Sequence, residues 1–118
     1  MEYRRLGASG LRVSPICLGT MMFGGRTSEK ASRAIISSAR DAGVNFIDTA
    51  NTYVKGESER ITGRAIKRHR HEWVLATKGG NPIGKGPNDR GLGAKNLHKA
   101  IDDSLQRLGT DFVDIYYF

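Results

Sequence analysis

The sequence predicts an α/β protein built from parallel strands and crossover helices, and two observations support this class. Short apolar runs, typical of buried strands, alternate with segments whose apolar residues recur every three or four positions, as on one face of a helix. A helix between successive strands brings the chain back to the edge at which the previous strand began, so neighbouring strands are expected to run parallel.

The first element is a predicted hairpin over residues 3–14, in which strands 3–6 and 11–14 flank a turn rich in Gly and Ser. A short strand follows in "PICLGT", residues 15–20, and breaks at Gly19. A helix is predicted from Ser28 onward, because small apolar residues recur along one face and Gly43 stands where a C-terminal cap belongs.

The second half of the sequence repeats this alternation. "VNFIDTA", residues 44–50, is a predicted buried strand, and "ESERITGRAIKR", residues 57–68, has acids at its start and cations at its end, as the helix dipole favours. A third strand over residues 73–77 meets Lys78, a helix over residues 97–108 is closed by Gly109, and "DFVDIYYF", residues 111–118, is a fourth strand.

Two architectures fit parallel strands: an open doubly wound sheet and a closed barrel. A dinucleotide-binding open sheet requires G-x-G-x-x-G after its first strand, and "GTMMFGG", residues 19–25, does not match it. The glycine-rich loop over residues 79–93 is not a phosphate-binding P-loop either, since Gly84-Lys85 is followed by Gly86 rather than Ser or Thr. We expect this loop to be a flexible rim, because long loops in compact domains are commonly functional or mobile.

The composition describes one small soluble domain of 118 residues without an apolar run long enough to cross a membrane. Arg12 and Pro15 interrupt the apolar residues that a targeting signal would need, so the expected location is cytoplasmic. Cys17 is the single cysteine, which excludes an intramolecular disulfide, and within "VSPICLG" it is expected to behave as a small buried hydrophobe.

The net charge of +7 raises the question of an acidic partner. The densest cationic run, "RAIKRHRH" over residues 64–71, falls where a helix should end, and cations there complement the helix dipole. This run contains no aromatic residue for base stacking, so a nucleic-acid partner is a weak alternative that only the charge supports. His69 and His71 are interpreted as surface residues, and no metal site is expected.

Three polar residues follow the predicted strands. Asp48 ends the second strand, Tyr53 lies in the loop after it, and Lys78 ends the third, and these ends gather on one face of a parallel barrel. A free tyrosine titrates near pH ~10, so proton donation at neutral pH is helped by an ammonium that stabilises the phenolate and by a carboxylate that anchors the ammonium. The alternative is an ordinary turn aspartate and a solvated lysine.

The chain resembles the N-terminal part of the aldo-keto reductases, in particular bacterial members. The motifs that carry this resemblance are "LGTMMFGG", "FIDTANTY" with the spacing D-x-x-x-x-Y, and "ATKGG", with further similarity in "GPNDRGLGAKNL" and "SLQRLGTDFVDIYY". The resemblance covers essentially all 118 residues, and several motifs in the right order make it specific.

The resemblance implies the first half of a TIM-type (β/α)8 barrel whose base is plugged by the N-terminal hairpin, with residues 1–118 forming the N-terminal portion of a single barrel domain. It also implies NADPH-dependent reduction of aldehydes or ketones, in which Asp48, Tyr53 and Lys78 take catalytic roles and Tyr53 gives the proton. Gly19, Thr20 and Met21 would contact the nicotinamide side of the cofactor, together with Asp48. Met21, Met22 and Phe23 would form an apolar wall beside the substrate, unless Phe23 is simply packed in the core.

The family's fourth catalytic residue is a histidine in a D-x-Y-x-x-H pattern, and the position expected to hold it follows Phe118 directly. A barrel of this kind takes about 250 residues, so only four of its eight strands are expected here. Half of a barrel would expose sheet edges and an apolar face. An oligomer in which another copy covers these surfaces is therefore an open alternative. An alternative to an enzyme is a non-catalytic module, such as the cofactor-binding channel subunits among the family's members, or an inactive half-barrel fragment.

Overall fold

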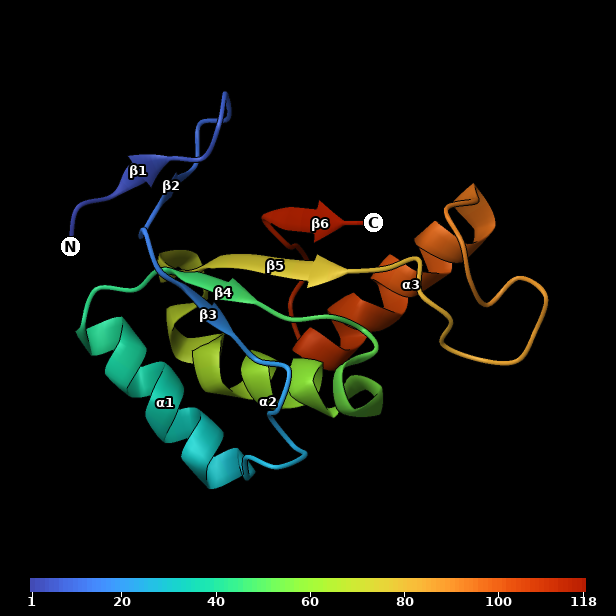
Figure 1. Ribbon diagram of the computed structural model, residues 1–118, viewed down its shortest axis with the longest axis horizontal. Coiled ribbons are helices and arrows are strands. Elements are labelled where there is room, and N and C mark those ends of the chain that lie inside the picture. The colour runs from blue at the N-terminus through green and yellow to red at the C-terminus, as the bar shows by residue number, and fades with distance from the viewer.

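Four apolar runs form one parallel sheet in the computed structural model, which describes residues 1–118 (Figure 1). The strands are β3 (Cys17–Gly19), β4 (Phe46–Asp48), β5 (Val74–Lys78) and β6 (Ile115–Tyr117), and they lie side by side in this order. Each neighbouring pair is parallel, which confirms the predicted class.

Three helices connect the strands as crossovers: α1 (Glu29–Asp41), α2 (Glu57–Ile66) and α3 (Ala94–Leu108). The Ser28 side chain caps α1 by accepting from the backbone N–H of Ala31 at 3.2 Å. Gly109 ends α3 at φ 64°, a left-handed conformation that glycine adopts readily. Two short 3₁₀ segments, η1 (Tyr53–Gly56) and η2 (Lys67–Glu72), flank α2, so this helix ends earlier than the predicted residue 68.

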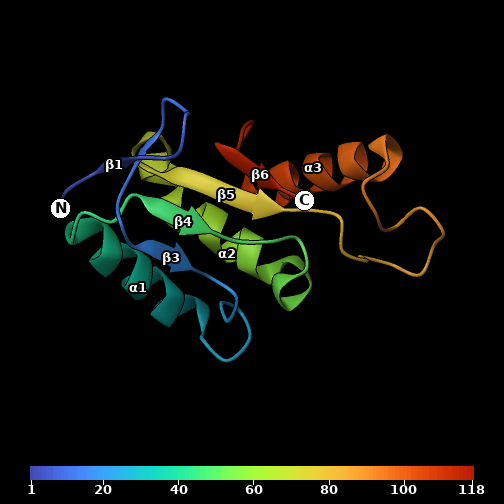
Figure 2. The ribbon, with the colours of Figure 1, turned by 45° about the horizontal axis from the view of Figure 1, so that its top comes forward.

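All three helices cover the same face of the sheet, as the two views in Figure 1 and Figure 2 show. Side chains alternate between the faces of a strand, and Ile47 and Leu75 point into the helix layer, where both are fully buried. The core between the two layers consists of Phe23, Ile36, Val44, Ile47, Ile61, Ile66, Trp73, Leu75 and Leu108.

The N-terminal hairpin consists of β1 (Arg4–Arg5) and β2 (Arg12–Val13), which pair antiparallel as predicted. It lies at the end of the sheet where the parallel strands begin (Figures 1 and 2). Tyr3 donates its hydroxyl to the Gly43 carbonyl at 2.8 Å, and Asn45 Oδ1 accepts from the Ser14 N–H at 2.7 Å. These bonds join the hairpin to the turn that precedes β4.

The expectation that Cys17 is buried is wrong, because the residue is exposed. Residues of β3 and β4 pair in register, Cys17 with Phe46 and Leu18 with Ile47. Since Ile47 points toward the helices, Cys17 and Phe46 point to the opposite face, which no helix of the chain covers. The thiol therefore lines an open cavity of about 640 Å³ on that face.

The loop over residues 79–93 contains neither helix nor strand, and backbone hydrogen bonds join its two halves. The N–H of Ile83 donates to the Asp89 carbonyl at 3.0 Å, and the N–H of Gly91 donates to the Gly80 carbonyl at 2.7 Å. Its assignment as a flexible rim stays a prediction.

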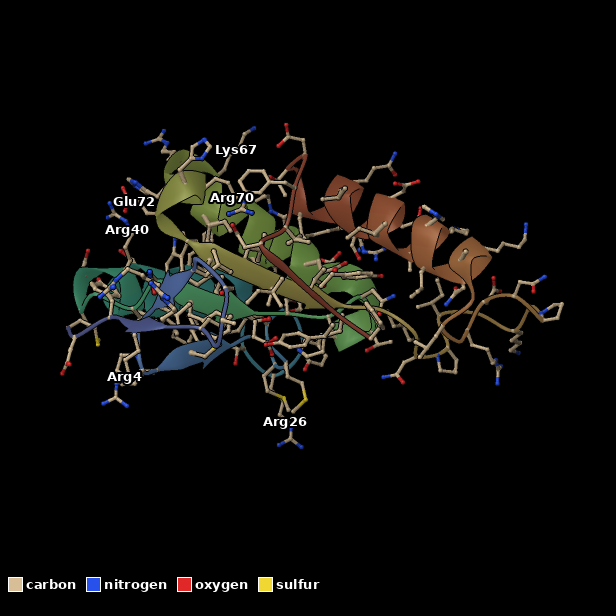
Figure 3. All side chains as sticks on the ribbon, turned by 90° about the horizontal axis from the view of Figure 1, so that it is seen from above. Arg4, Arg26, Arg40, Lys67, Arg70 and Glu72 are labelled. Atoms are coloured by element: carbon tan, nitrogen blue, oxygen red, sulfur yellow. The ribbon has the colours of Figure 1, made fainter.

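Several of the cations lie apart from one another on the molecule (Figure 3). Arg40 of α1 pairs with Glu72 of η2 at 2.6 Å, and Figure 3 shows the two side chains together, whereas Arg4, Arg26 and Lys67 extend from different elements in different directions. His71 stacks on the Phe112 ring with 6.0 Å between centroids. None of the helices is long and apolar enough to span a membrane.

Candidate active site

The sheet register explains why Asp48 and Lys78 meet although 30 residues separate them. Asp48 pairs with Ala76 in the β4–β5 ladder, and Lys78 follows Ala76 by two positions. Residues two positions apart share a face of a strand, so both side chains emerge on the face away from the helices. Tyr53 reaches the same place from η1, directly after β4.

The Lys78 ammonium uses all three of its protons in this site. It donates to Asp48 Oδ2 at 2.6 Å, to the Thr49 carbonyl at 3.0 Å and to the Tyr53 hydroxyl oxygen at 3.2 Å. Since Tyr53 accepts this bond, its own O–H proton is free to point away from the lysine. The structure therefore brings together the three residues that the sequence singled out.

The charge state of the site follows from these contacts. Burial of the ammonium by itself lowers the pKa of Lys78, but the hydrogen bonds and charges of Asp48 and Tyr53 outweigh it, and the pKa is raised. The side chains of Lys78 and Asp48 are 33% and 25% exposed, so water reaches the pair. Lys78 is thus a cation at neutral pH, and it points at the Tyr53 hydroxyl oxygen.

The turn after Tyr53 has an unusual backbone. Val54 and Lys55 adopt φ values of 48° and 52°, in the left-handed region that residues with a Cβ avoid at a cost of about 1–2 kcal/mol each. Val54 is β-branched, which makes this conformation rarer still. Strained backbone of this kind clusters at functional sites, where surrounding contacts hold it in place.

A cleft of about 270 Å³ opens beside Tyr53 and Asp48. Its other walls come from the end of β3 and the loop that follows it, and they are Gly19, Thr20, Met21, Met22 and Phe23. The two methionines are 54% and 43% exposed, whereas Phe23 is 4% exposed and belongs to the core, which favours the packing interpretation for Phe23. The residues expected to contact a cofactor thus lie around one opening.

Beneath the site lies a set of polar side chains that the sequence reasoning did not single out: Ser58, Glu59, Thr77 and Arg107. Glu59 was interpreted only as an acid near a helix N-terminus, yet it is fully buried. A signal was present, since Glu59 falls on the same helical stripe as Thr62, Gly63 and Ile66, and a charge on a buried stripe needs a partner.

The parallel strands with helices on one face, and charged groups at the strand ends, define a class of barrel-type α/β proteins with a site above the sheet. The family model described as "Aldo/keto reductase family" matches residues 15–118. The chain belongs to this family, which confirms the resemblance seen in its motifs.

A solved structure shows the same fold. The chain is similar to the aldo-keto reductase AKR11C1 from Bacillus halodurans in its holo form, with a TM-score of 0.88 and 37% identity over 98% of this chain and 39% of that one. The expected first half of a TIM-type (β/α)8 barrel is therefore confirmed.

Two curated relatives carry different descriptions. The chain is 43% identical to the uncharacterized oxidoreductase YrpG of Bacillus subtilis, over 98% of this chain and 39% of the relative. It is 41% identical to a probable voltage-gated potassium channel subunit beta of Oryza sativa, over 99% of this chain and 37% of the relative. The chain thus spans less than half the length of these relatives.

Proposed function

We propose that the protein carrying this chain is an NADPH-dependent oxidoreductase that reduces aldehydes or ketones to alcohols, and that residues 1–118 are the N-terminal portion of its single barrel domain. The observation that carries the proposal is the Lys78 ammonium bonded to both Asp48 and Tyr53 at the carboxyl ends of adjacent strands. Membership of the family and the oxidoreductase relative support the same reading. A cytoplasmic location and a small carbonyl substrate belong to this proposal.

The cleft beside Tyr53 fits the nicotinamide end of the cofactor. A Cβ added at Gly19 would meet no atom within 4 Å, so the space over this residue is open to a flat ring. Exposed Met21 offers an apolar surface, and Asp48 Oδ1 has no hydrogen bond within the chain and can accept one from a ribose hydroxyl. Gly19, Met21 and Asp48 would contact this end of NADPH, which supplies a hydride to the carbonyl carbon when bound, whereas Thr20 is fully buried and would contribute by fixing the loop between them.

Tyr53 then gives its proton to the carbonyl oxygen. The Lys78 ammonium stabilises the phenolate that remains, because a hydrogen bond from a charged donor to a developing anion strengthens as the charge forms. Asp48 keeps the ammonium charged and in place. In this scheme Tyr53 is the acid, Lys78 activates it, and Asp48 anchors Lys78.

Tyr53→Phe tests the assignment in the complete protein. It removes the proton donor and leaves the cleft walls intact, so we expect kcat for carbonyl reduction to fall about 100-fold or more while the Kd for NADPH changes less than about twofold. Steady-state kinetics and cofactor fluorescence measure the two quantities, with Tyr3→Phe in the hairpin as control. Near-normal turnover of Tyr53→Phe would refute the role of Tyr53.

Lys78→Met makes the complementary test of the activator. The substitution keeps an apolar stem of similar length and removes the charge next to the phenol, so turnover should fall while Tyr53 is still present. A variant that retains wild-type kcat across neutral pH would show that the ammonium does not assist the proton transfer.

A second candidate is a non-catalytic module that binds the cofactor, since plant relatives with 41% identity are described as probable potassium channel subunits. The two candidates differ in turnover. An enzyme oxidises NADPH in proportion to the carbonyl consumed, whereas a module binds NADPH without such turnover.

A further inference from the structure

Two consecutive residues in the first turn of α2, Ser58 and Glu59, lie under the strand ends that carry the site. Both are fully buried, and both make hydrogen bonds to residues next to the proposed catalytic ones. Because side chains alternate along a strand, Thr49 and Thr77 point into the helix layer while Asp48 and Lys78 point away from it.

Ser58 joins α2 to the ends of β3 and β4. Its hydroxyl donates to the Thr20 carbonyl at 2.8 Å, and lies 2.8 Å from Thr20 Oγ1 and 3.1 Å from Thr49 Oγ1. Thr20 in turn donates both its N–H and its hydroxyl to the Asp48 carbonyl, at 3.1 and 3.0 Å. The backbone of Asp48 is therefore tied to α2 through a chain of buried hydroxyl groups.

Glu59 joins α2 to β5 and α3. Its Oε1 accepts from the Thr77 hydroxyl at 2.6 Å, and its Oε2 accepts from Arg107 Nε at 2.5 Å. Arg107 also donates to Ser104 Oγ at 3.2 Å, so its orientation on α3 is set by two partners. Thr77 immediately precedes Lys78, and the backbone of Lys78 is thereby tied to the same turn of α2.

Stability alone does not explain these groups. A buried ion pair is often no more stabilising than apolar residues of the same volume, and buried hydroxyls require partners for every bond that they lose to water. What a fully satisfied polar network adds is one defined geometry. Hydrogen bonds of 2.5–2.6 Å on both carboxylate oxygens hold Glu59 in a single orientation between two elements.

We propose that Ser58 and Glu59 are positioning residues, which hold the ends of β4 and β5 so that Asp48, Lys78 and Tyr53 meet. The inference rests on the function proposed for that site. Neither residue faces the cleft, and each acts through the threonine that neighbours a site residue.

The test uses four variants of the complete protein. Thr77→Val removes the bond to Glu59 while keeping the side-chain shape, and Thr77→Ser retains the hydroxyl and should rescue. Ser58→Ala removes the hydroxyl that links α2 to Thr20 and Thr49. Glu57→Gln is the matched control, since it removes a carboxylate from the same helix turn whose partner is the surface Arg60.

The first readout is the titration of Lys78. It is monitored by NMR of protein labelled with ¹³C at the lysine ε carbons, and the signal of Lys78 is assigned as the one that is lost in Lys78→Met. Contacts with Asp48 and Tyr53 raise the pKa of Lys78, so an ammonium displaced from them should titrate at lower pH. We expect this decrease in Thr77→Val and Ser58→Ala, and wild-type titration in Thr77→Ser and Glu57→Gln.

The second readout is steady-state carbonyl reduction. Misplacement of a catalytic group by a fraction of an ångström should lower kcat about tenfold in Thr77→Val and Ser58→Ala. The KM for the carbonyl substrate should stay within about twofold of the wild-type value. Thermal unfolding confirms that each variant is folded. Wild-type values of both the Lys78 titration and kcat in folded Thr77→Val and Ser58→Ala would overturn the inference.

The two proposals fail in different ways. If the wild-type protein reduces no carbonyl but Lys78 still titrates at lower pH in Thr77→Val and Ser58→Ala, the positioning role stands and the proposed function fails. If the wild-type protein is active and these variants change neither quantity, the function stands and the positioning role fails. Should Ser58→Ala not fold, Thr77→Val alone decides, because it changes one hydroxyl to a methyl group on a strand.

Discussion

At the scale of single residues, the charges of the candidate site influence the pKa of the Cys17 thiol. Cys17 lies on the open face of the sheet together with Asp48 and Lys78. Partial burial and, to a smaller extent, the Asp48 carboxylate raise the pKa of the Cys17 thiol, the Lys78 ammonium opposes them, and together they bring it to about 11. An exposed thiol with this pKa is almost entirely protonated at neutral pH and reacts slowly.

Cys17 alkylation tests this balance of charges. Thiolate is the reactive form, so iodoacetamide should modify Cys17 at pH ~8 roughly 100-fold more slowly than a thiol with the ordinary value of 9.0. Asp48→Asn removes a charge that raises the pKa and should accelerate the reaction several-fold. Mass spectrometry of timed samples measures the rate, with Asp41→Asn on the surface of α1 as control; equal rates in wild type and Asp48→Asn would contradict the prediction.

The sequence predicted that Asp48, Tyr53 and Lys78 would lie close together, because they stand at or just after strand ends, and the hydrogen bonds of Lys78 confirm this proximity. The environment of Cys17 could not be predicted in the same way. A thiol within an apolar run looks buried, and only the placement of all three helices on one face leaves it exposed.

At the scale of elements, the contact between α2 and α3 depends on Gly63. A Cβ added at this position would lie 2.1 Å from the carbonyl oxygen of Leu108, which is backbone and cannot turn aside. Glycine in the middle of a helix costs roughly 0.5–1 kcal/mol relative to alanine, and here it allows the two helices to touch.

Gly63→Ala is expected to destabilise the protein by about 3 kcal/mol, because the added methyl group forces α3 away from α2 and opens the core around Leu108. Urea denaturation followed by circular dichroism measures the free energy of unfolding. Gly10→Ala in the hairpin turn is the matched control, since a Cβ there meets nothing within 4 Å and should change stability by less than about 0.5 kcal/mol. Equal stabilities of the two variants would show that the helices can separate freely.

Most elements were predictable because each carries its own local signal. Ser28 and Gly43 bracket α1, and Gly109 ends α3, as capping chemistry requires. The end of α2 was predicted less well: residues 67–72 continue as a 3₁₀ segment rather than α-helix. Local periodicity does not distinguish an α-helix from a 3₁₀-helix over the last turn.

At the scale of the whole molecule, the chain has one covered and one uncovered sheet face. The helices bury the first, and the second carries the cavity of about 640 Å³ lined in part by Phe46, Tyr117 and Phe118. Phe118 is 72% exposed. The outer strands β3 and β6 each have one edge without a strand partner.

The 118-residue chain is therefore expected to bind the dye ANS, which reports exposed apolar surface. Phe118→Gln removes an aromatic ring from the open cavity without adding a charge, and it should lower the dye fluorescence more than Leu92→Gln does. Leu92 is the matched control, because it is also apolar and 61% exposed but does not line that cavity. Equal fluorescence changes in the two variants would show that the dye does not bind the open face.

The sequence by itself determined the alternation of strands and helices, the hairpin, the caps and the three polar residues of the candidate site, because each depends on neighbours within a few positions. The tertiary structure alone decided that Cys17 is exposed, that Glu59 is a buried carboxylate between Thr77 and Arg107, and that Gly63 is a point of helix contact. These features arise where surfaces distant in sequence meet: 48 residues separate Glu59 from Arg107. No local pattern encodes which side chain will stand opposite another once the layers pack.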